Sequence, residues 1–209
     1  MRTHFFYLLF IFAVISPPEG HTAFNSSSLP QEVKRQLQQD QKLSETQIDE
    51  LWKGEILSQV KVKTKQNTQN LDLWVSAFHP QNCRKALRKI SHYEGYDEFL
   101  SFIKSSEYDD KTQRWKIKLD HVLMPFPMYL DFKMPRVKKE GNYPFTFKKG
   151  FLSGLLGEVK AQETASRCQL TLTSKWSGPK TKIPDIVFSS FVQTLAELGL
   201  RHLIRSSTL

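Results

Sequence analysis

Few side chains in this sequence have the type and setting to do chemistry, and His121 is the most conspicuous of them. It shares a row with Leu119 and Leu123 in an alternating stretch, so we expect it on the apolar face of a strand. A neutral imidazole there could orient a quinone or carbonyl oxygen, or act as a general base if its pKa stays near the working pH. The plainer interpretation, a histidine at a strand end with its ring half in water, is favoured.

The known catalytic and metal-binding motifs are missing from the sequence. There is no Gly-x-Ser-x-Gly elbow, no His-Glu-x-x-His and no glycine loop that would cradle phosphate. Asp109 and Asp110 precede Lys111 in an expected hairpin turn, which explains them, and His202 suits the C-terminal end of a helix dipole. We therefore expect no metal, no cofactor and, on balance, no enzyme.

The two cysteines, Cys83 and Cys168, permit two interpretations. Without a paired histidine spacing they do not make a zinc site. A bridge between them would close a long loop and could contribute roughly 4 kcal/mol in the chain-entropy model. Cys168, however, lies on the apolar row of an expected strand, where a free thiol behaves as a small hydrophobe. We expect free thiols, with a disulfide as the alternative.

Residues 1–23 have the pattern of a secretory signal peptide. Arg2 and His4 lead into an apolar run from Phe5 to Ile15, which is too short for a transmembrane helix of about 20 residues. Gly20 and Ala23 are both small enough to precede the cleavage site. The sequence thus predicts an exported protein, periplasmic or secreted, with a retained membrane anchor as the alternative. No second stretch approaches spanning length.

The chain is basic, with 30 Lys and Arg against 21 Asp and Glu and a formal net charge of +9. This excess favours anionic neighbours, although scattered lysines can equally serve solubility. Because an exported protein does not meet cellular nucleic acid, we expect no nucleic-acid partner. We also expect a monomer. Five basic residues could touch anionic lipid headgroups or the envelope surface: Arg136, Lys138, Lys139, Lys148 and Lys149.

The stretch from Arg114 to Met134 alternates apolar and polar residues on either side of a proline-rich junction. Strict period-two alternation is typical of half-buried antiparallel strands, and a one-residue slip would turn charge into the core. The expected buried rows are Trp115, Ile117, Leu119, His121 and Leu123 on one strand, and Met128, Leu130, Phe132 and Met134 on the next.

The other elements follow from periodicity and turn residues. Residues 24–54 are expected to form an N-terminal helical extension, with a capping box at Ser44 and Gln47. Strands are expected at 56–63 and 71–78, as a hairpin or as one bent strand, and two short helices at 80–102. After a charged loop at 138–142, further strands are expected at 143–147, 150–161 and 168–176. Glycines in residues 150–161 suggest bulges or close approach by another group.

The last element is expected to be a long amphipathic helix with Asp185 as its N-cap. Its apolar stripe comprises Val187, Phe188, Phe191, Val192, Leu195, Leu198 and His202. Strands in series without intervening helices imply an antiparallel sheet, and the terminal helix must cover its apolar face. The fold class is therefore α+β.

This order of elements, and several segments within it, resemble the helix-grip fold of the START/SRPBCC superfamily, which includes coenzyme Q-binding START-like proteins and polyketide cyclases. The resemblance covers residues 55–203, and we assign 55–209 to the domain. Its carriers are the helical pair at 80–102, Leu-Met-Pro-Phe-Pro-Met at 123–128, the glycine-containing strand at 151–159, Cys-Gln-Leu-Thr-Leu at 168–172 and Ile-Pro-Asp-Ile-Val-Phe at 183–188.

The resemblance implies a curved antiparallel sheet wrapped around the long C-terminal helix, with a cavity between them for a hydrophobic small molecule such as a lipid or isoprenoid quinone. The expected lining is Trp115, Leu119, His121, Leu130, Phe132, Leu172, Trp176, Phe188, Phe191 and Leu195. Two alternatives remain. A cyclase-like or hydrolytic enzyme would use His121 in the same cavity, and an envelope protein with a filled core would bind a partner instead.

Overall fold

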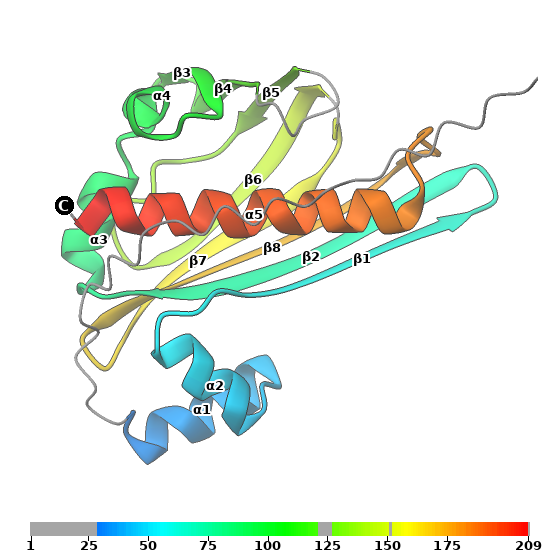
Figure 1. Ribbon diagram of the computed structural model, residues 1–209. Helices are drawn as coiled ribbons and strands as arrows, with labels where there is room; N and C mark the ends of the chain where they lie inside the picture. Colours follow the sequence, from blue (N-terminus) through cyan, green and yellow to red (C-terminus); the bar gives the residue numbers. More distant parts are fainter. Residues whose placement is uncertain (1–28, 121–126, 151, 209) are drawn as a thin grey trace, which may run out of the picture.

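The computed structural model describes residues 29–120, 127–150 and 152–208. The expected signal peptide and His121 therefore lie outside the described residues. In the described part, eight antiparallel strands form one curved sheet in the order β1-β2-β8-β7-β6-β5-β4-β3, and a long C-terminal helix runs along its concave face (Figure 1). This is the α+β helix-grip architecture expected from the sequence.

The strands are β1 Leu57–Lys65, β2 Thr68–His79, β3 Ile103–Asp109, β4 Arg114–Leu119, β5 Met128–Lys133, β6 Gly141–Gly150, β7 Leu156–Thr164 and β8 Arg167–Pro179. The helices are α1 Gln31–Gln41, α2 Glu45–Trp52, α3 Cys83–Ile90, η1 Tyr93–Gly95 (a 3₁₀ turn), α4 Tyr96–Phe99 and α5 Asp185–Thr208.

The alternation in residues 114–134 produces the strand pair that it predicted. β4 and β5 are antiparallel, with Ile117 opposite Leu130 and Trp115 opposite Phe132. Trp115 and Phe132 are buried, while Lys116 between the apolar positions of β4 is exposed. One face of this pair therefore belongs to the core. The register is fixed because a shift by one residue would turn the apolar side chains to solvent.

Residues 56–78 form a hairpin, which decides between the two arrangements left open by the sequence. Lys65 pairs with Thr68, and Gln66 in the turn has φ 52°. β2 continues past the hairpin between two apolar clusters. Leu71 and Leu73 pack in the main core, whereas Phe78 packs into a second apolar cluster on the opposite face of the sheet. The long β1–β2 ribbon is thus the part of the sheet that both helical layers use.

The N-terminal helices cover the outer face of β2 (Figure 1). The capping box is confirmed, since Ser44 Oγ accepts from the Gln47 N–H and Gln47 Oε1 accepts from the Ser44 N–H. Ile48 and Leu51 of α2 are completely buried with Phe78. The molecule therefore has three layers: N-terminal helices, sheet and C-terminal helix.

The start of α5 differs from the prediction. Asp185 is the first residue of the helix and not its N-cap. Its carboxylate accepts hydrogen bonds from the Thr64 N–H at 2.7 Å, the Thr64 hydroxyl at 2.6 Å and Gln69 Nε2 at 2.7 Å. These bonds fasten the helix to the tip of the β1–β2 hairpin and lower the pKa of Asp185.

The apolar stripe of α5 is only partly buried. Phe188 and Val192 are buried, but Val187 is 53% exposed and Leu198 is 38% exposed. In the described structure, α5 lies mainly along β1, β2 and α3. The stripe predicted from the sequence therefore overstates burial, because the helix packs mainly against one part of the curved sheet.

The expectation of free thiols is wrong, because Cys83 and Cys168 form a disulfide. Cys83 is the first residue of α3, and Cys168 is the second residue of β8. The Cys168 N–H donates to the Gln81 carbonyl at 2.9 Å, so the chain entering α3 already lies against β8. The apolar row did predict the burial of Cys168, but burial alone cannot separate a free thiol from a bridge.

Candidate ligand-binding cavity

A cavity of about 390 Å³ lies between the inner face of the sheet and α5. Strands β2 to β8, the α3–α4 segment, the β6–β7 connection and α5 all contribute to its wall. This volume is within the range of about 300–1,000 Å³ that small-molecule sites occupy. None of the described lining residues is charged.

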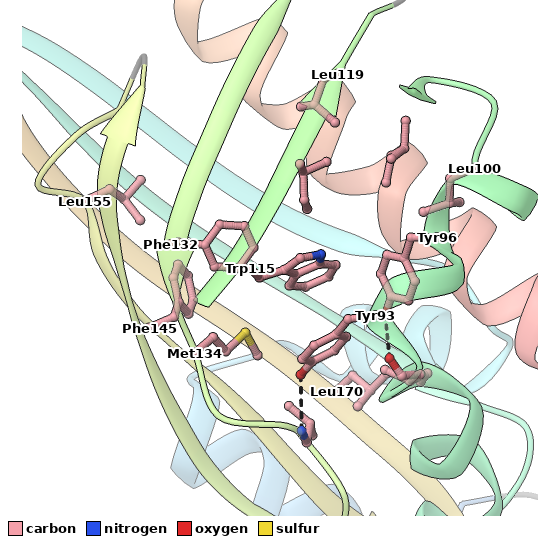
Figure 2. Close-up of a cluster of buried hydrophobic side chains, with 14 of the residues drawn as sticks. Tyr93, Tyr96, Leu100, Trp115, Leu119, Phe132, Met134, Phe145, Leu155 and Leu170 are labelled. Atoms are coloured by element: carbon pink, nitrogen blue, oxygen red, sulfur yellow. Dashed lines mark hydrogen bonds between the residues drawn. The ribbon is translucent and has the colours of Figure 1, made fainter. Parts of the chain in front are cut away.

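One side of the wall is a series of aromatic rings (Figure 2). Tyr93 and Trp115 stack with ring centroids 4.1 Å apart, and Phe132 lies 5.0 Å from Trp115. Phe147 in turn stacks on Phe132 at 5.0 Å. Rings that pack against one another have little conformational freedom left to lose when a ligand binds, so they form a preorganised apolar surface.

The polar atoms of this aromatic wall are occupied by the protein itself. Trp115 Nε1 donates to Ser106 Oγ at 2.8 Å. The Tyr93 hydroxyl accepts from the Val137 N–H at 3.1 Å, and the Tyr96 hydroxyl donates to the Ile90 carbonyl at 2.6 Å; Figure 2 draws both bonds. Burial raises the pKa of both phenols, so they stay neutral.

The opposite side of the wall is α5, which presents small residues to the cavity. Ala196 and Gly199 line it together with the half-buried Leu195 and Leu200. A Cβ at Gly199 would have no heavy atom within 4 Å. Glycine lowers helix stability by about 1 kcal/mol relative to alanine, so this position keeps room at a cost.

Two glycines allow the β5–β7 part of the sheet to curve around the cavity. A Cβ at Gly157 would meet the Phe145 ring at 2.3 Å, and one at Gly150 would meet the Tyr129 carbonyl oxygen at 2.0 Å. Gly150 also has φ +103°, a conformation that L side chains rarely adopt. The close approach expected from glycines in residues 150–161 is confirmed.

Several solved structures resemble this fold over about two thirds to three quarters of the chain. A START superfamily protein from Mycobacterium smegmatis is 9% identical, with 74% of this chain and 98% of that chain covered at a TM-score of 0.53. Ara h 8.0201 is 12% identical, with 66% and 98% covered at 0.51. The di-domain ARO/CYC StfQ of the steffimycin biosynthetic pathway is 8% identical, with 66% and 49% covered at 0.54.

This chain has the START/SRPBCC fold. At these identities the likeness concerns the fold alone. No protein-family model and no curated protein matches the sequence. The START/SRPBCC helix-grip architecture commonly encloses a hydrophobic ligand, and the cavity described above lies where that architecture leaves space, between the sheet and its terminal helix.

Seven residues of the expected lining lie in the wall of this START/SRPBCC cavity: Trp115, Leu119, Leu130, Phe132, Leu172, Phe191 and Leu195. Trp176 and Phe188 do not line it, because their rings pack edge to face at 6.1 Å and Trp176 Nε1 donates to the Ser153 carbonyl. His121 is outside the described residues. Sequence reasoning missed Tyr93 and Tyr96 as lining, since residues in short helices show no clear inward period. It also missed Gly199 of the long helix α5, because a glycine adds nothing to an apolar stripe.

The structure distinguishes Arg136 from the other four basic residues expected at a lipid surface. Its guanidinium bonds to both carboxylate oxygens of Glu94, to Asp110 and to the Ser91 carbonyl, and it lies over the Tyr108 ring at 4.3 Å. These bonds lower the pKa of Glu94 and Asp110 and raise that of Arg136. Arg136 is therefore a structural link, whereas Lys138, Lys139, Lys148 and Lys149 are exposed.

The described part of the chain offers little catalytic chemistry around the START/SRPBCC cavity. Within it, no group of three or more His, Cys, Asp or Glu residues could hold a metal ion. His79 is buried but outside the cavity wall, and burial lowers its pKa to about 4. None of the helices in the described ranges is long and apolar enough to span a bilayer.

Proposed function

We propose that this protein binds a neutral hydrophobic small molecule, such as a lipid or an isoprenoid quinone, between the sheet and α5. The observation that carries the proposal is the composition of the cavity wall: it is uncharged over its described part, and the tyrosine and tryptophan polar atoms in it already have protein partners. A charged ligand would lose its hydration there without compensation.

The mechanism is sequestration. Affinity comes from apolar burial, at about 25 cal/mol for each Å² removed from water, and preorganised rings reduce the entropy lost on binding. An empty apolar cavity of this size is costly to a folded protein, because its lining atoms lack contacts on one side. A bound ligand would restore those contacts, so binding should also stabilise the fold.

The similarity in fold to the ARO/CYC protein StfQ supports an enzymatic alternative. Acid–base catalysis would need a titratable group within reach of the ligand. The described wall supplies only Tyr93 and Tyr96, whose pKa values burial raises. His121 would have to supply the rest, and replacing it with alanine should then abolish turnover while leaving ligand uptake intact.

The export proposal gains support from the disulfide, because such bridges persist mainly in oxidising compartments. Together with the signal-like residues 1–23, it favours a secreted or periplasmic location. The measured mass of the exported protein should correspond to a chain that begins directly after Gly20 or Ala23. An intact Met1 on the exported protein would support the retained anchor instead.

The exposed lysines favour delivery at an anionic membrane. Lys148 and Lys149 flank the β6–β7 connection, whose Leu152 and Leu155 line the cavity, and the neighbouring Leu156 is 59% exposed. Vesicle sedimentation with and without phosphatidylserine tests this contact. The double substitution Lys148→Gln/Lys149→Gln should weaken binding to anionic vesicles, while Lys104→Gln/Lys111→Gln, on exposed sites of another edge, should leave it unchanged.

Native mass spectrometry of the purified protein, followed by organic extraction, tests the binding function itself. We expect a fraction of the protein to carry a discrete additional mass that dissociates on collisional activation and is recovered in the organic phase. Repeated absence of any such mass, together with no uptake of added lipids, would remove the proposal.

A further inference from the structure

One polar atom in the cavity wall has no partner. Ser174 on β8 is 3% exposed, and among the described residues its Oγ is the buried side-chain polar atom without a hydrogen bond. A buried hydroxyl left unsatisfied destabilises the folded state, so native proteins rarely keep one without a reason. Ser174 also lines the cavity.

The surroundings of Ser174 explain why the protein cannot satisfy it. On the same face its cross-strand neighbours are Leu73 of β2 and Gly157 of β7, and neither side chain can form a hydrogen bond. Along β8 the flanking inward residues are Leu172, which is apolar, and Trp176, whose indole N–H is committed to Ser153. None of these neighbours offers a partner, and the cavity that Ser174 lines is where a ligand could supply one.

Thr171, the other serine or threonine among the described lining residues, has a partner for its hydroxyl. Thr171 Oγ1 lies 3.0 Å from Ser76 Oγ, and Gln169 Nε2 also donates to Ser76 Oγ. Thr171 and Gln169 alternate with the cavity row of β8, Ser76 pairs with Thr171 on the neighbouring β2, and Gln169 also bonds to Gln41 of α1. Thr171 is therefore satisfied by a network on the far face of the sheet, which leaves Ser174 as the unpartnered hydroxyl among the described wall residues.

We infer that Ser174 is the polar anchor of the ligand site and that the ligand is a neutral, mainly apolar molecule with one hydrogen-bonding oxygen, a hydroxyl or a carbonyl. This rests on the proposed function and specifies its ligand class. Phosphate and carboxylate groups are disfavoured at this end, because no cation in the described wall would pair with them.

The sheet register places this anchor at one end of the cavity. Ser174 pairs with Leu73, which pairs with Val60, whose carbonyl accepts from Ser189 near the start of α5. Gly199 lies ten residues further along the helix, or about 15 Å. The oxygen of the ligand therefore sits toward the Asp185 end, and its apolar body extends along α5 toward the space at Gly199.

The test compares two ligands of similar length, 1-decanol and 1-chlorodecane, as competitors of Nile red. In the wild type we expect the ratio of dissociation constants to favour decanol about fivefold more than in Ser174→Ala, the effect of one neutral hydrogen bond. The matched control, Ser177→Ala on the exposed face of β8, should keep the wild-type ratio. Removal of an unpartnered hydroxyl should also raise the melting temperature of the ligand-free protein by about 2–4 °C.

The outcomes separate the two proposals. If both ligands bind but the ratio is the same in wild type and Ser174→Ala, Ser174 is not the anchor and the binding function stands. If Ser174→Ala lowers the melting temperature of the ligand-free protein, the hydroxyl has a protein partner and the inference fails. If neither ligand nor Nile red binds any variant, the proposed function fails and the anchor with it.

Discussion

His79 is a histidine with no exposed surface, and both of its ring nitrogens are engaged. Nδ1 accepts from the Gln81 N–H at 3.1 Å, so Nε2 carries the proton and donates to Ser207 Oγ at 3.0 Å. The Ser207 hydroxyl in turn donates to the Leu203 carbonyl. The neutral ring thus joins the end of β2 to the last turn of α5, and a second ring proton would displace the Gln81 bond.

This arrangement predicts how stability depends on pH. Burial, assisted by the nearby Lys89, lowers the pKa of His79 from 6.5 to about 4. Above pH 6.5 the residue is neutral in both states and has no effect; as the pH falls from 6.5 to 4 only the unfolded chain takes up the proton, so stability decreases. The full loss is on the order of 3 kcal/mol.

Urea denaturation at pH 7 and pH 4.5 measures this loss. In His79→Gln we expect a smaller decrease between the two pH values than in the wild type, even if the variant is less stable overall. His92→Gln, at an exposed histidine, serves as the control and should follow the wild type. An identical pH dependence in His79→Gln and wild type would refute this role of the ring.

At the same scale, Ser174 shows what sequence reasoning could have found. The apolar row of β8 contains Leu170, Leu172 and Trp176, and Ser174 occupies the position between the last two. A polar residue in an apolar row is a signal, but without coordinates it cannot be told from a strand end or a bulge. Its lack of a partner depends on Leu73 and Gly157, which only the register brings beside it.

At the scale of elements, the disulfide makes a direct prediction. It joins residues 85 apart in sequence, and the chain-entropy model gives a contribution of about 4–5 kcal/mol for a loop of that length. The double variant Cys83→Ala/Cys168→Ala should unfold at a lower denaturant concentration than the wild type. Adding dithiothreitol should lower the stability of the wild type and leave the variant unchanged. Equal stability of both proteins without reductant would contradict the contribution of the bridge.

Elements with one dry and one wet face were predictable, and elements covered on both sides were less so. β4 and β5 alternate clearly because their outer face meets water. The last five residues of β2, from Val75 to His79, are all buried, because α2 and α5 cover opposite faces of the sheet there. Period-two reasoning gives no face assignment in such a run, so the strand pattern could not show that Phe78 packs against the apolar stripe of α2 in the second core cluster.

The start of α5 shows a related limit. An acidic residue after a proline at a helix start suggests a cap, because local sequence contains only local partners. The partners of Asp185 are Thr64 and Gln69, more than 110 residues away. The same side chain therefore holds two elements together, which the sequence could not show.

At the scale of the whole molecule, the order of elements carried most of the fold. In the described residues, two strands, short helices, six further strands and a terminal helix follow one another, as the resemblance implied. The eight strands form one curved sheet. The cavity was expected from the resemblance to the helix-grip fold and not from the apolar pattern, because apolar rows alone are equally consistent with a filled core. Small residues in the wall add to its room, among them Gly199 on α5, where a Cβ would meet no heavy atom within 4 Å.

The central claim, that this internal space receives an apolar ligand, is tested most directly by filling it at Gly199. Nile red binding is measured for the wild type, Gly199→Leu and the matched control Gly199→Ala, with folding checked by circular dichroism. Both variants gain helix propensity, so both should be at least as stable as the wild type. We expect Gly199→Ala to retain probe binding and Gly199→Leu to lose it by about tenfold or more, since leucine occupies the space that the ligand needs. A folded Gly199→Leu that binds the probe as tightly as the wild type would contradict the account.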